Sequence, residues 1–131
     1  MKGLLLMLGG VVLLLAAGGA SASFSCGLGA GTPYCQYEGK VERVYVNDNG
    51  RILAFIPSSF DSSLAEAQGL SSVTYTNAFM YLVDYQTDAS PEFAKMLYAT
   101  LLSAQAQNRD VQMQMRKVIG GYLVIDRIWI N

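Results

Sequence analysis

The two cysteines are the residues whose chemistry the sequence defines most sharply. Cys26 and Cys35 are nine positions apart, and the chain of 131 residues has no other cysteine. In an oxidising compartment each has only the other as a partner, so we predict one disulfide that closes a loop of ten residues. Their spacing differs from the CxxC spacing of redox-active dithiols, which favours a structural role.

Three glycines, Gly27, Gly29 and Gly31, lie between the cysteines and give this loop the composition of a phosphate-binding loop. A dinucleotide-binding loop follows a strand and precedes a helix, because the helix N-terminus holds the phosphate. We expect neither neighbour on the flanks of this loop. The glycines are therefore interpreted as residues that let a short disulfide-closed loop turn.

Residues that could carry catalysis are few. The chain contains no histidine, which excludes histidine-based triads, histidine acid–base catalysis and histidine metal sites. Four acidic residues lie singly near turns and helix ends, where solvation and capping explain them: Asp84, Asp88, Glu92 and Asp110. The sequence also lacks a Ser-x-x-Lys motif. We therefore predict that the protein is not an enzyme and has no catalytic residue, metal site or cofactor.

Tyrosine, in contrast, is abundant, with eight residues in the chain. A tyrosine ring stacks on the apolar face of a sugar while its hydroxyl finds a hydrogen-bonding partner. The ligand-binding candidates lie beside the cysteine loop and near two later turns: Tyr34, Tyr37, Asp48, Asn49, Arg51 and Lys117. Each type also has an ordinary role that stays open at this point. The tyrosines can pack, the turn residues can simply form the turn, and the basic residues can be solvated charges.

The N-terminus has the organisation of a secretory signal peptide. One positive charge at Lys2 precedes an apolar stretch over residues 4–17, and Ala20-Ser21-Ala22 places small side chains at the cleavage site. We expect cleavage after Ala22, so that residues 1–22 are the signal peptide and the protein is periplasmic or secreted. An uncleaved N-terminal anchor and a lipoprotein attached through Cys26 are the alternatives. A membrane-spanning helix needs about 20 apolar residues, more than this stretch provides.

The charge of the remaining chain bears on its partners. Removal of residues 1–22 takes away Lys2 and leaves eight basic and ten acidic residues, a formal charge of −2. A protein that binds nucleic acid needs a basic stripe that replaces the phosphate counterions, and the sequence shows none. We therefore expect no nucleic-acid partner, and no membrane partner after the signal peptide has been cleaved.

Residues 39–131 are predicted to form one domain, after an N-terminal segment of residues 23–38 that holds the disulfide loop. The runs 41–46 and 51–56 flank a turn that ends in Asn49-Gly50, and this pattern predicts a β-hairpin with a type I′ turn. Residues 62–68 could form one or two helical turns. Residues 73–84 are apolar or aromatic on both faces, which predicts a third strand of about twelve residues.

A helix is predicted from Ser90 to about Gln107. The Ser90 hydroxyl caps free amides, Pro91 occupies the first turn, and Glu92 meets the positive end of the helix dipole. We expect Asn108 to adopt the left-handed conformation that ends the helix, because asparagine tolerates it better than most residues.

Two further strands are predicted after this helix. Residues 111–116 alternate, with Val111, Met113 and Met115 facing inward, and a turn over residues 117–121 leads to a last strand at 122–130. Asp126 and Arg127 are adjacent polar residues within an apolar strand, and they indicate a β-bulge or a barrel rim.

The predicted order, β-β-β-α-β-β, is that of the OB-fold. The fold class that we predict is therefore mainly β (β+α), a five-stranded OB-like barrel with one capping helix between strands 3 and 4. The last forty residues also resemble the B subunits of secreted AB5 toxins of the subtilase-cytotoxin and pertussis-like group, and related small exported proteins. This resemblance lies in FAKMLYATLLSA at 93–104, VQMQM at 111–115 and YLVIDRIWIN at 122–131. It implies a glycan ligand, a homo-oligomer that is pentameric if toxin-like, and a catalytic A subunit.

Two functions follow as hypotheses. The first is a small secreted or periplasmic binding module for carbohydrate, similar to an AB5 B subunit, which uses the face of strands 2 and 3 and the adjoining loops of the barrel. The alternative is a non-enzymatic structural or protein-interaction domain of the bacterial envelope, in which sheet edges pair between copies. The two tyrosine candidates beside the cysteines do not align with the sugar pocket of the toxin family.

Overall fold

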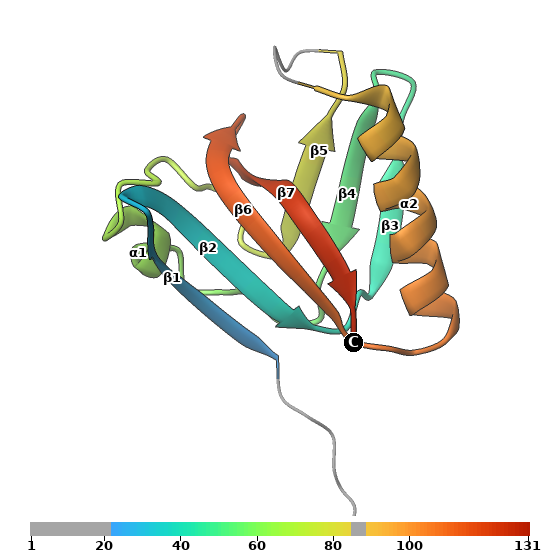
Figure 1. The fold of residues 1–131 in the computed structure, drawn as a ribbon, viewed down its shortest axis with the longest axis horizontal. Coiled ribbons are helices and arrows are strands. Elements are labelled where there is room, and N and C mark those ends of the chain that lie inside the picture. Colours follow the sequence, from blue (N-terminus) through green and yellow to red (C-terminus); the bar gives the residue numbers. More distant parts are fainter. Residues whose placement is uncertain (1–21, 85–88) are drawn as a thin grey trace, which may run out of the picture.

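The structure, a computed structural model, describes residues 22–84 and 89–131. The predicted signal peptide lies outside the described residues except for Ala22. The chain is mainly β, with seven strands and two helices in the described part (Figure 1): β1 (Ser23–Gly29), β2 (Thr32–Gly39), β3 (Arg43–Val46), β4 (Arg51–Phe55), α1 (Ser62–Glu66), β5 (Ala78–Leu82), α2 (Pro91–Ala106), β6 (Val111–Ile119) and β7 (Tyr122–Ile130). Within this part, no helix is long and apolar enough to cross a membrane.

The strands form one open sheet in the order β1-β2-β6-β7-β5-β4-β3. Neighbours are antiparallel except β5 and β7, which run parallel and pair at Met80 and Val124. Figure 1 shows α2 alongside β3 and β4, whereas α1 lies beside β1 at the other side of the sheet. The predicted order of three strands, a helix and two strands is present from β3 to β7.

The prediction of a closed five-stranded barrel is wrong. A closed barrel of β3 to β7 needs β6 to pair with β3, but β6 pairs instead with β2 over Cys35–Gly39. The β1–β2 hairpin therefore occupies the edge that would close the barrel, and β1 and β3 remain the two edges of the sheet. The segment 23–38 is accordingly part of the sheet rather than a disulfide loop in front of it.

The predicted disulfide between Cys26 and Cys35 is present. It joins two residues that lie directly opposite each other in the β1–β2 hairpin. The turn of this hairpin is Ala30-Gly31, in which both residues have positive φ, 52° and 82°. Two successive residues with positive φ are typical of the type I′ turn, whose twist matches that of the flanking strands.

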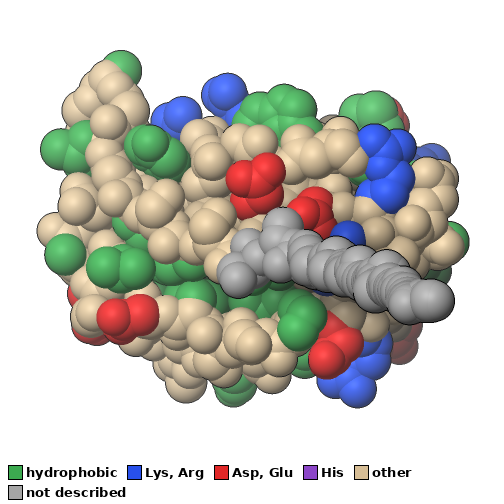
Figure 2. Space-filling view, turned by 90° about the horizontal axis from the view of Figure 1, so that it is seen from below, with side chains coloured by type: hydrophobic (Ala, Val, Ile, Leu, Met, Phe, Trp, Pro, Cys, Tyr) green, Lys and Arg blue, Asp and Glu red, His purple; other side chains and the backbone are tan. Residues whose placement is uncertain are grey.

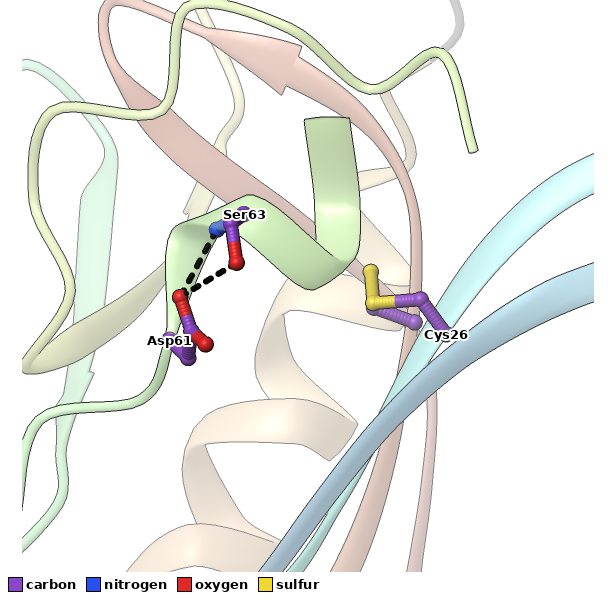
Figure 3. Close-up of a disulfide and its surroundings, with 4 residues drawn as sticks. Cys26, Asp61 and Ser63 are labelled. Atoms are coloured by element: carbon purple, nitrogen blue, oxygen red, sulfur yellow. Dashed lines mark hydrogen bonds between the residues drawn. A yellow bond between two sulfur atoms is a disulfide. The ribbon is translucent and has the colours of Figure 1, made fainter. Parts of the chain in front are cut away.

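The disulfide lies next to the short helix α1, as Figure 3 shows. The Asp61 carboxylate caps this helix by accepting hydrogen bonds from the Ser63 amide (3.0 Å) and the Ser63 hydroxyl (2.7 Å). These two bonds also hold the pKa of Asp61 below its ordinary value. The helix lies within residues 62–68, where one or two helical turns were predicted.

The predicted β3–β4 hairpin is present, but its turn is not type I′. Gly50 has a φ of 74°, whereas Asn49 is not among the described residues with positive φ. The Gly50 amide donates to the Asn47 carbonyl (3.2 Å), and the Asn47 amide donates to the Arg51 carbonyl (3.1 Å). This pattern is a three-residue loop that closes through one left-handed glycine.

The third predicted strand, 73–84, is shorter in the structure and covers only β5. Ser72 has a φ of 68°, which interrupts an extended run. The next residues bond to other segments: the amides of Thr74 and Tyr75 donate to the Gly121 carbonyl (2.8 and 3.0 Å), and the Phe60 amide donates to the Thr76 carbonyl (2.9 Å). Hydrogen bonds to other segments therefore keep residues 73–77 out of the strand that their sequence pattern predicts.

The last two strands match their predicted positions, but β6 continues to Ile119 and the turn is reduced to Gly120-Gly121. Gln114 pairs with Arg127 and Met115 with Ile125, so Asp126 is the extra residue of a bulge in β7. The predicted bulge at Asp126-Arg127 is thus confirmed. The Asp126 carboxylate lies 3.1 Å from the Arg127 guanidinium and 3.6 Å from that of Arg116.

Helix α2 begins and ends as the sequence predicts. The Ser90 hydroxyl accepts a hydrogen bond from the Phe93 amide (3.1 Å), Pro91 is the first helical residue, and Asn108 has a φ of 51°. The buried side of the helix consists of Ala94, Leu97, Leu101 and Ala104.

The Ser90 cap gives a first testable prediction. We expect Ser90→Ala to lower the free energy of unfolding by about 1 kcal/mol, because the Phe93 amide loses its acceptor. Urea denaturation followed by circular dichroism measures this change. Ser90→Asp retains an acceptor at the cap and serves as the control. Equal stability of the alanine and aspartate variants would contradict a role for the cap.

The core is centred on aromatic rings from separate segments. Phe79 of β5 is fully buried and lies 5.3 Å from Phe60, 5.4 Å from Tyr37 and 6.3 Å from Phe24 between ring centroids. The three inward residues predicted for β6, Val111, Met113 and Met115, are also fully buried. These contacts join β1, β2, β5 and the loop before α1 into one hydrophobic core.

Candidate functional site

The strand register places two predicted site residues on one outer face of the sheet. Residues directly opposite each other in a ladder share a face, and so do residues two apart in one strand. Tyr45 pairs with Leu53, and Arg51 lies two residues before Leu53. Leu53 pairs with Met80, Met80 with Val124, and Val124 with Lys117. Arg51, Lys117 and Tyr45 therefore lie on the same face.

Tyr122 is two residues before Val124 and joins this face from β7. Its ring stacks on the ring of Tyr75, with centroids 4.3 Å apart and planes 15° from parallel. The loop that carries Tyr75 is held by the two hydrogen bonds from Thr74 and Tyr75 to the Gly121 carbonyl. We call the set Tyr45, Arg51, Tyr75, Lys117 and Tyr122 the tyrosine face.

A glycine is required where this loop meets the β6–β7 turn. Gly121 has a φ of 86°, and a Cβ at this position would lie 2.9 Å from the Cβ of Thr74. A side chain at Gly121 would push the Tyr75 loop away from Tyr122. The close approach of the turn and the loop is therefore what sets the ring stack in place.

The floor of the tyrosine face is apolar and its rim is exposed. Leu53, Met80 and Val124 are buried, whereas Tyr45 and Tyr75 are 44% and 45% exposed. Exposed aromatic rings above a buried apolar floor offer flat surfaces that can stack on a ligand. Two strands, β3 and β7, and the loop before β5 hold the rings, so the sheet largely fixes their arrangement.

Arg51 brings an unsatisfied donor to this face. Its backbone amide donates to the Asn47 side-chain oxygen (3.1 Å), which anchors the residue at the start of β4. Its Nε atom is buried and has no hydrogen-bond partner within the described residues. Buried polar groups are normally paired, so a donor of this kind calls for a functional or structural explanation.

Electrostatic effects connect four members of the tyrosine face. The pKa of Tyr122 lies above its ordinary value, mainly because burial disfavours the charged phenolate. Tyr75 and Tyr45 raise this pKa further, whereas the charge of Arg51 lowers it. The four side chains are thus close enough to influence one another.

A pocket of about 210 Å³ opens beside Lys117, near the place where β5 and β7 pair. Its polar lining comes from Ser90, Lys117 and Asp126, and its aromatic lining from Tyr81 and Phe93. The Tyr81 hydroxyl accepts a hydrogen bond from the Ser90 amide (2.8 Å). Both rings are engaged in packing, at 4.9 Å from each other. Tyr81 follows Met80 in β5 and faces the opposite side of the sheet, where α2 lies, so this pocket does not extend the tyrosine face and borders it only at Lys117.

The other sequence candidates lie elsewhere. Tyr34 is half-buried on β2, where its ring covers the Cβ positions of Gly27 and Gly29 at 3.5 to 3.8 Å. Asp48 and Asn49 are exposed in the β3–β4 turn. Tyr37 is 1% exposed and its hydroxyl donates to the Lys40 carbonyl (2.7 Å), so this tyrosine packs in the core and is closed to a ligand.

Tyr37 allows a prediction about pH dependence. Burial, with a smaller effect from the Asp110 carboxylate, raises the pKa of Tyr37 from 10.0 to about 12. In the unfolded chain the phenol ionises near its ordinary pKa, so the stability that Tyr37 contributes is complete below pH 10 and is lost as the pH rises toward about 12. We expect tyrosinate absorbance to show a late step that is missing in Tyr37→Phe. A late step of the same size in both proteins would contradict this assignment.

No family model, curated protein or solved structure matches the chain. The function must therefore be argued from the site itself.

Charges are mixed at the end of the molecule near the C-terminus. Figure 2 shows this end, with basic and acidic side chains distributed among uncharged ones. The Lys40 ammonium lies 2.9 Å from the Asp110 carboxylate, and the Asn131 side-chain amide donates to Glu38 (2.6 Å). Among the residues that the structure describes, no group of three metal-ligating side chains comes together.

Three members of the tyrosine face, Tyr45, Tyr75 and Tyr122, are absent from the sequence candidates. Tyr45 could not be placed there from the predicted hairpin, because a two-residue Asn49-Gly50 turn pairs it with Ala54, on the face opposite to Arg51, whereas the three-residue loop pairs it with Leu53. Tyr75 and Tyr122 could not be found either, because their contact depends on the path of the loop after α1.

Proposed function

We propose that the protein is an exported carbohydrate-binding module and that the tyrosine face is its ligand surface. The observation that carries this proposal is the group of exposed tyrosine rings around Arg51, whose buried Nε atom lacks a partner in the described part of the chain. The face extends over β4 and β5 and borders the β3–β4 and β6–β7 turns. This is the surface on which an OB-like arrangement binds its ligands.

Carbohydrate is the ligand class that these residues fit best. A pyranose has an apolar face that stacks on an aromatic ring and a periphery of hydroxyl groups that need donors and acceptors. Tyr45 and Tyr75 supply exposed rings, and Arg51 and Lys117 supply donors on the same face. The disulfide supports an extracytoplasmic location, because such bonds persist in oxidising compartments. Cleavage of the predicted signal peptide would accompany export to the periplasm or beyond.

Replacement of one ring tests the proposal. We expect the exported, oxidised protein to bind a subset of sugars on a glycan array and Tyr75→Ala to weaken that binding about tenfold or more, because one stacking surface is lost. Tyr98→Ala is the matched control, since Tyr98 is an exposed tyrosine on α2, away from this face. Absence of binding to any immobilised glycan, or equal binding by wild type and Tyr75→Ala, would refute the proposal.

The resemblance to AB5 B subunits implies an alternative assembly, which is not part of this proposal. In a toxin-like assembly the module would form a pentamer and carry a catalytic A subunit. A neighbouring reading frame for an exported protease or ADP-ribosyltransferase would support this arrangement. Without such a neighbour, the glycan-binding module would act alone.

A further inference from the structure

The outer edge of β1 is open, and its free backbone groups can be identified. The Cα atoms of Cys26 and Cys35 are 4.0 Å apart. In antiparallel sheets, a pair without mutual hydrogen bonds has a Cα separation of about 4.5 Å, and a hydrogen-bonded pair about 5.5 Å. The N–H and C=O groups of Cys26 therefore point away from β2. By alternation, those of Phe24 and Leu28 do so too.

These groups have no backbone partner within the described residues, where β1 bonds to β2 alone. The strand also lacks two of the features that normally protect an edge, charged residues and proline. Its sequence, SFSCGLG, contains no charged residue and no proline. The disulfide holds β1 firmly to β2, so the edge is already extended. Leu28 adds an apolar side chain that is 62% exposed.

The opposite edge of the sheet is protected. β3 has only four residues and begins with Arg43, whose guanidinium lies over the Phe55 ring at 4.3 Å. The Gln105 side chain of α2 donates to the carbonyl of Glu42, directly before β3 (2.8 Å). This bond ties α2 to the chain at the start of β3. A head-to-tail pairing of β1 with β3 of another copy is therefore disfavoured.

We propose that β1 pairs antiparallel with β1 of a second copy and so forms a two-fold symmetric dimer. Pairing centred on Cys26 places Phe24 of each copy opposite Leu28 of the other copy. The outward groups of Phe24, Cys26 and Leu28 then meet the same groups of the partner strand, which satisfies both edges. An isologous contact of this kind closes after two copies and leaves no free edge at β1. The dimer goes beyond the proposed sugar binding and does not depend on it.

Sedimentation velocity on the exported protein, from about 1 to 300 μM, tests this pairing in the range expected for a small interface. We expect the mass to rise from one chain to two with concentration. Leu28→Lys removes the apolar contact and adds edge charge, so it should raise the dimer dissociation constant about tenfold or more. Met96→Lys is the matched control, because Met96 on α2 is equally exposed at 62%. It should dimerise like the wild type.

Amide hydrogen exchange gives a second readout. The amides of Phe24, Cys26 and Leu28 should gain protection as the concentration rises, whereas those of β3 should not. A monomer over the whole range, an assembly of five chains, an unchanged dimer in Leu28→Lys, or equal losses in both lysine variants would each overturn the proposal.

Discussion

Reduction of the Cys26–Cys35 disulfide is expected to lower the free energy of unfolding by about 2 to 3 kcal/mol. The bond closes a ten-residue loop, and the loss of its constraint on the unfolded chain accounts for this magnitude. For a domain of about 100 residues the melting temperature should fall by about 10 °C or more. Cys35 is fully buried, so packing around the sulfur atoms adds to the effect in a variant.

Two samples separate the bond from the packing. Wild type with and without a reducing agent reports the bond itself, and Cys26→Ala/Cys35→Ala reports the bond together with the lost sulfur contacts. We expect the double variant to melt at or below the temperature of the reduced wild type, and to be insensitive to the reducing agent. Identical melting of oxidised and reduced wild type would show that the bond does not stabilise the native sheet.

Phe79→Ala is expected to be the most destabilising single substitution, at about 3 to 5 kcal/mol. The Phe79 ring lies among the rings of Phe24, Phe60 and Tyr37, so its removal leaves a cavity shared by three segments. Phe79→Leu fills most of this volume and should cost less. Met96→Ala, at an exposed helical position, should change stability by no more than about 0.5 kcal/mol.

Chemical denaturation measures these variants on one scale. If Phe79→Ala fails to fold, Phe79→Leu still reports on the cluster, because it should be less stable than wild type by an intermediate amount. Equal stabilities of Phe79→Leu and Met96→Ala would show that this ring is not the centre of the core.

The sequence predicts best those features whose physical causes are local. Ser90 and Asn108 mark the ends of α2 through capping, which involves only neighbouring residues. The β3–β4 hairpin follows from a turn signal between two β-forming runs, although the single left-handed glycine at Gly50 replaces the expected turn type. The bulge at Asp126 is visible because two adjacent polar residues cannot both face the core.

The features that the sequence does not predict depend on distant partners. Ala30-Gly31 is a weaker turn signal than Asn-Gly. The sequence therefore predicts a disulfide-closed loop between Cys26 and Cys35 where the structure has the β1–β2 hairpin. β2 and β3 compete to pair with β6, and the outcome depends on tertiary contacts. A local sequence pattern cannot predict which of the two strands pairs with β6. Tyr75 reaches the candidate site for a similar reason, since its loop is fixed by the distant Gly121 carbonyl.

The most direct test of the tyrosine face as a ligand surface is a nuclear magnetic resonance titration with the glycan bound best on the array. We expect the largest chemical-shift changes at Tyr45, Arg51, Tyr75 and Tyr122, and none at Tyr98 on α2. Changes centred instead on Tyr34 or on α2, with the tyrosine face unaffected, would contradict the account.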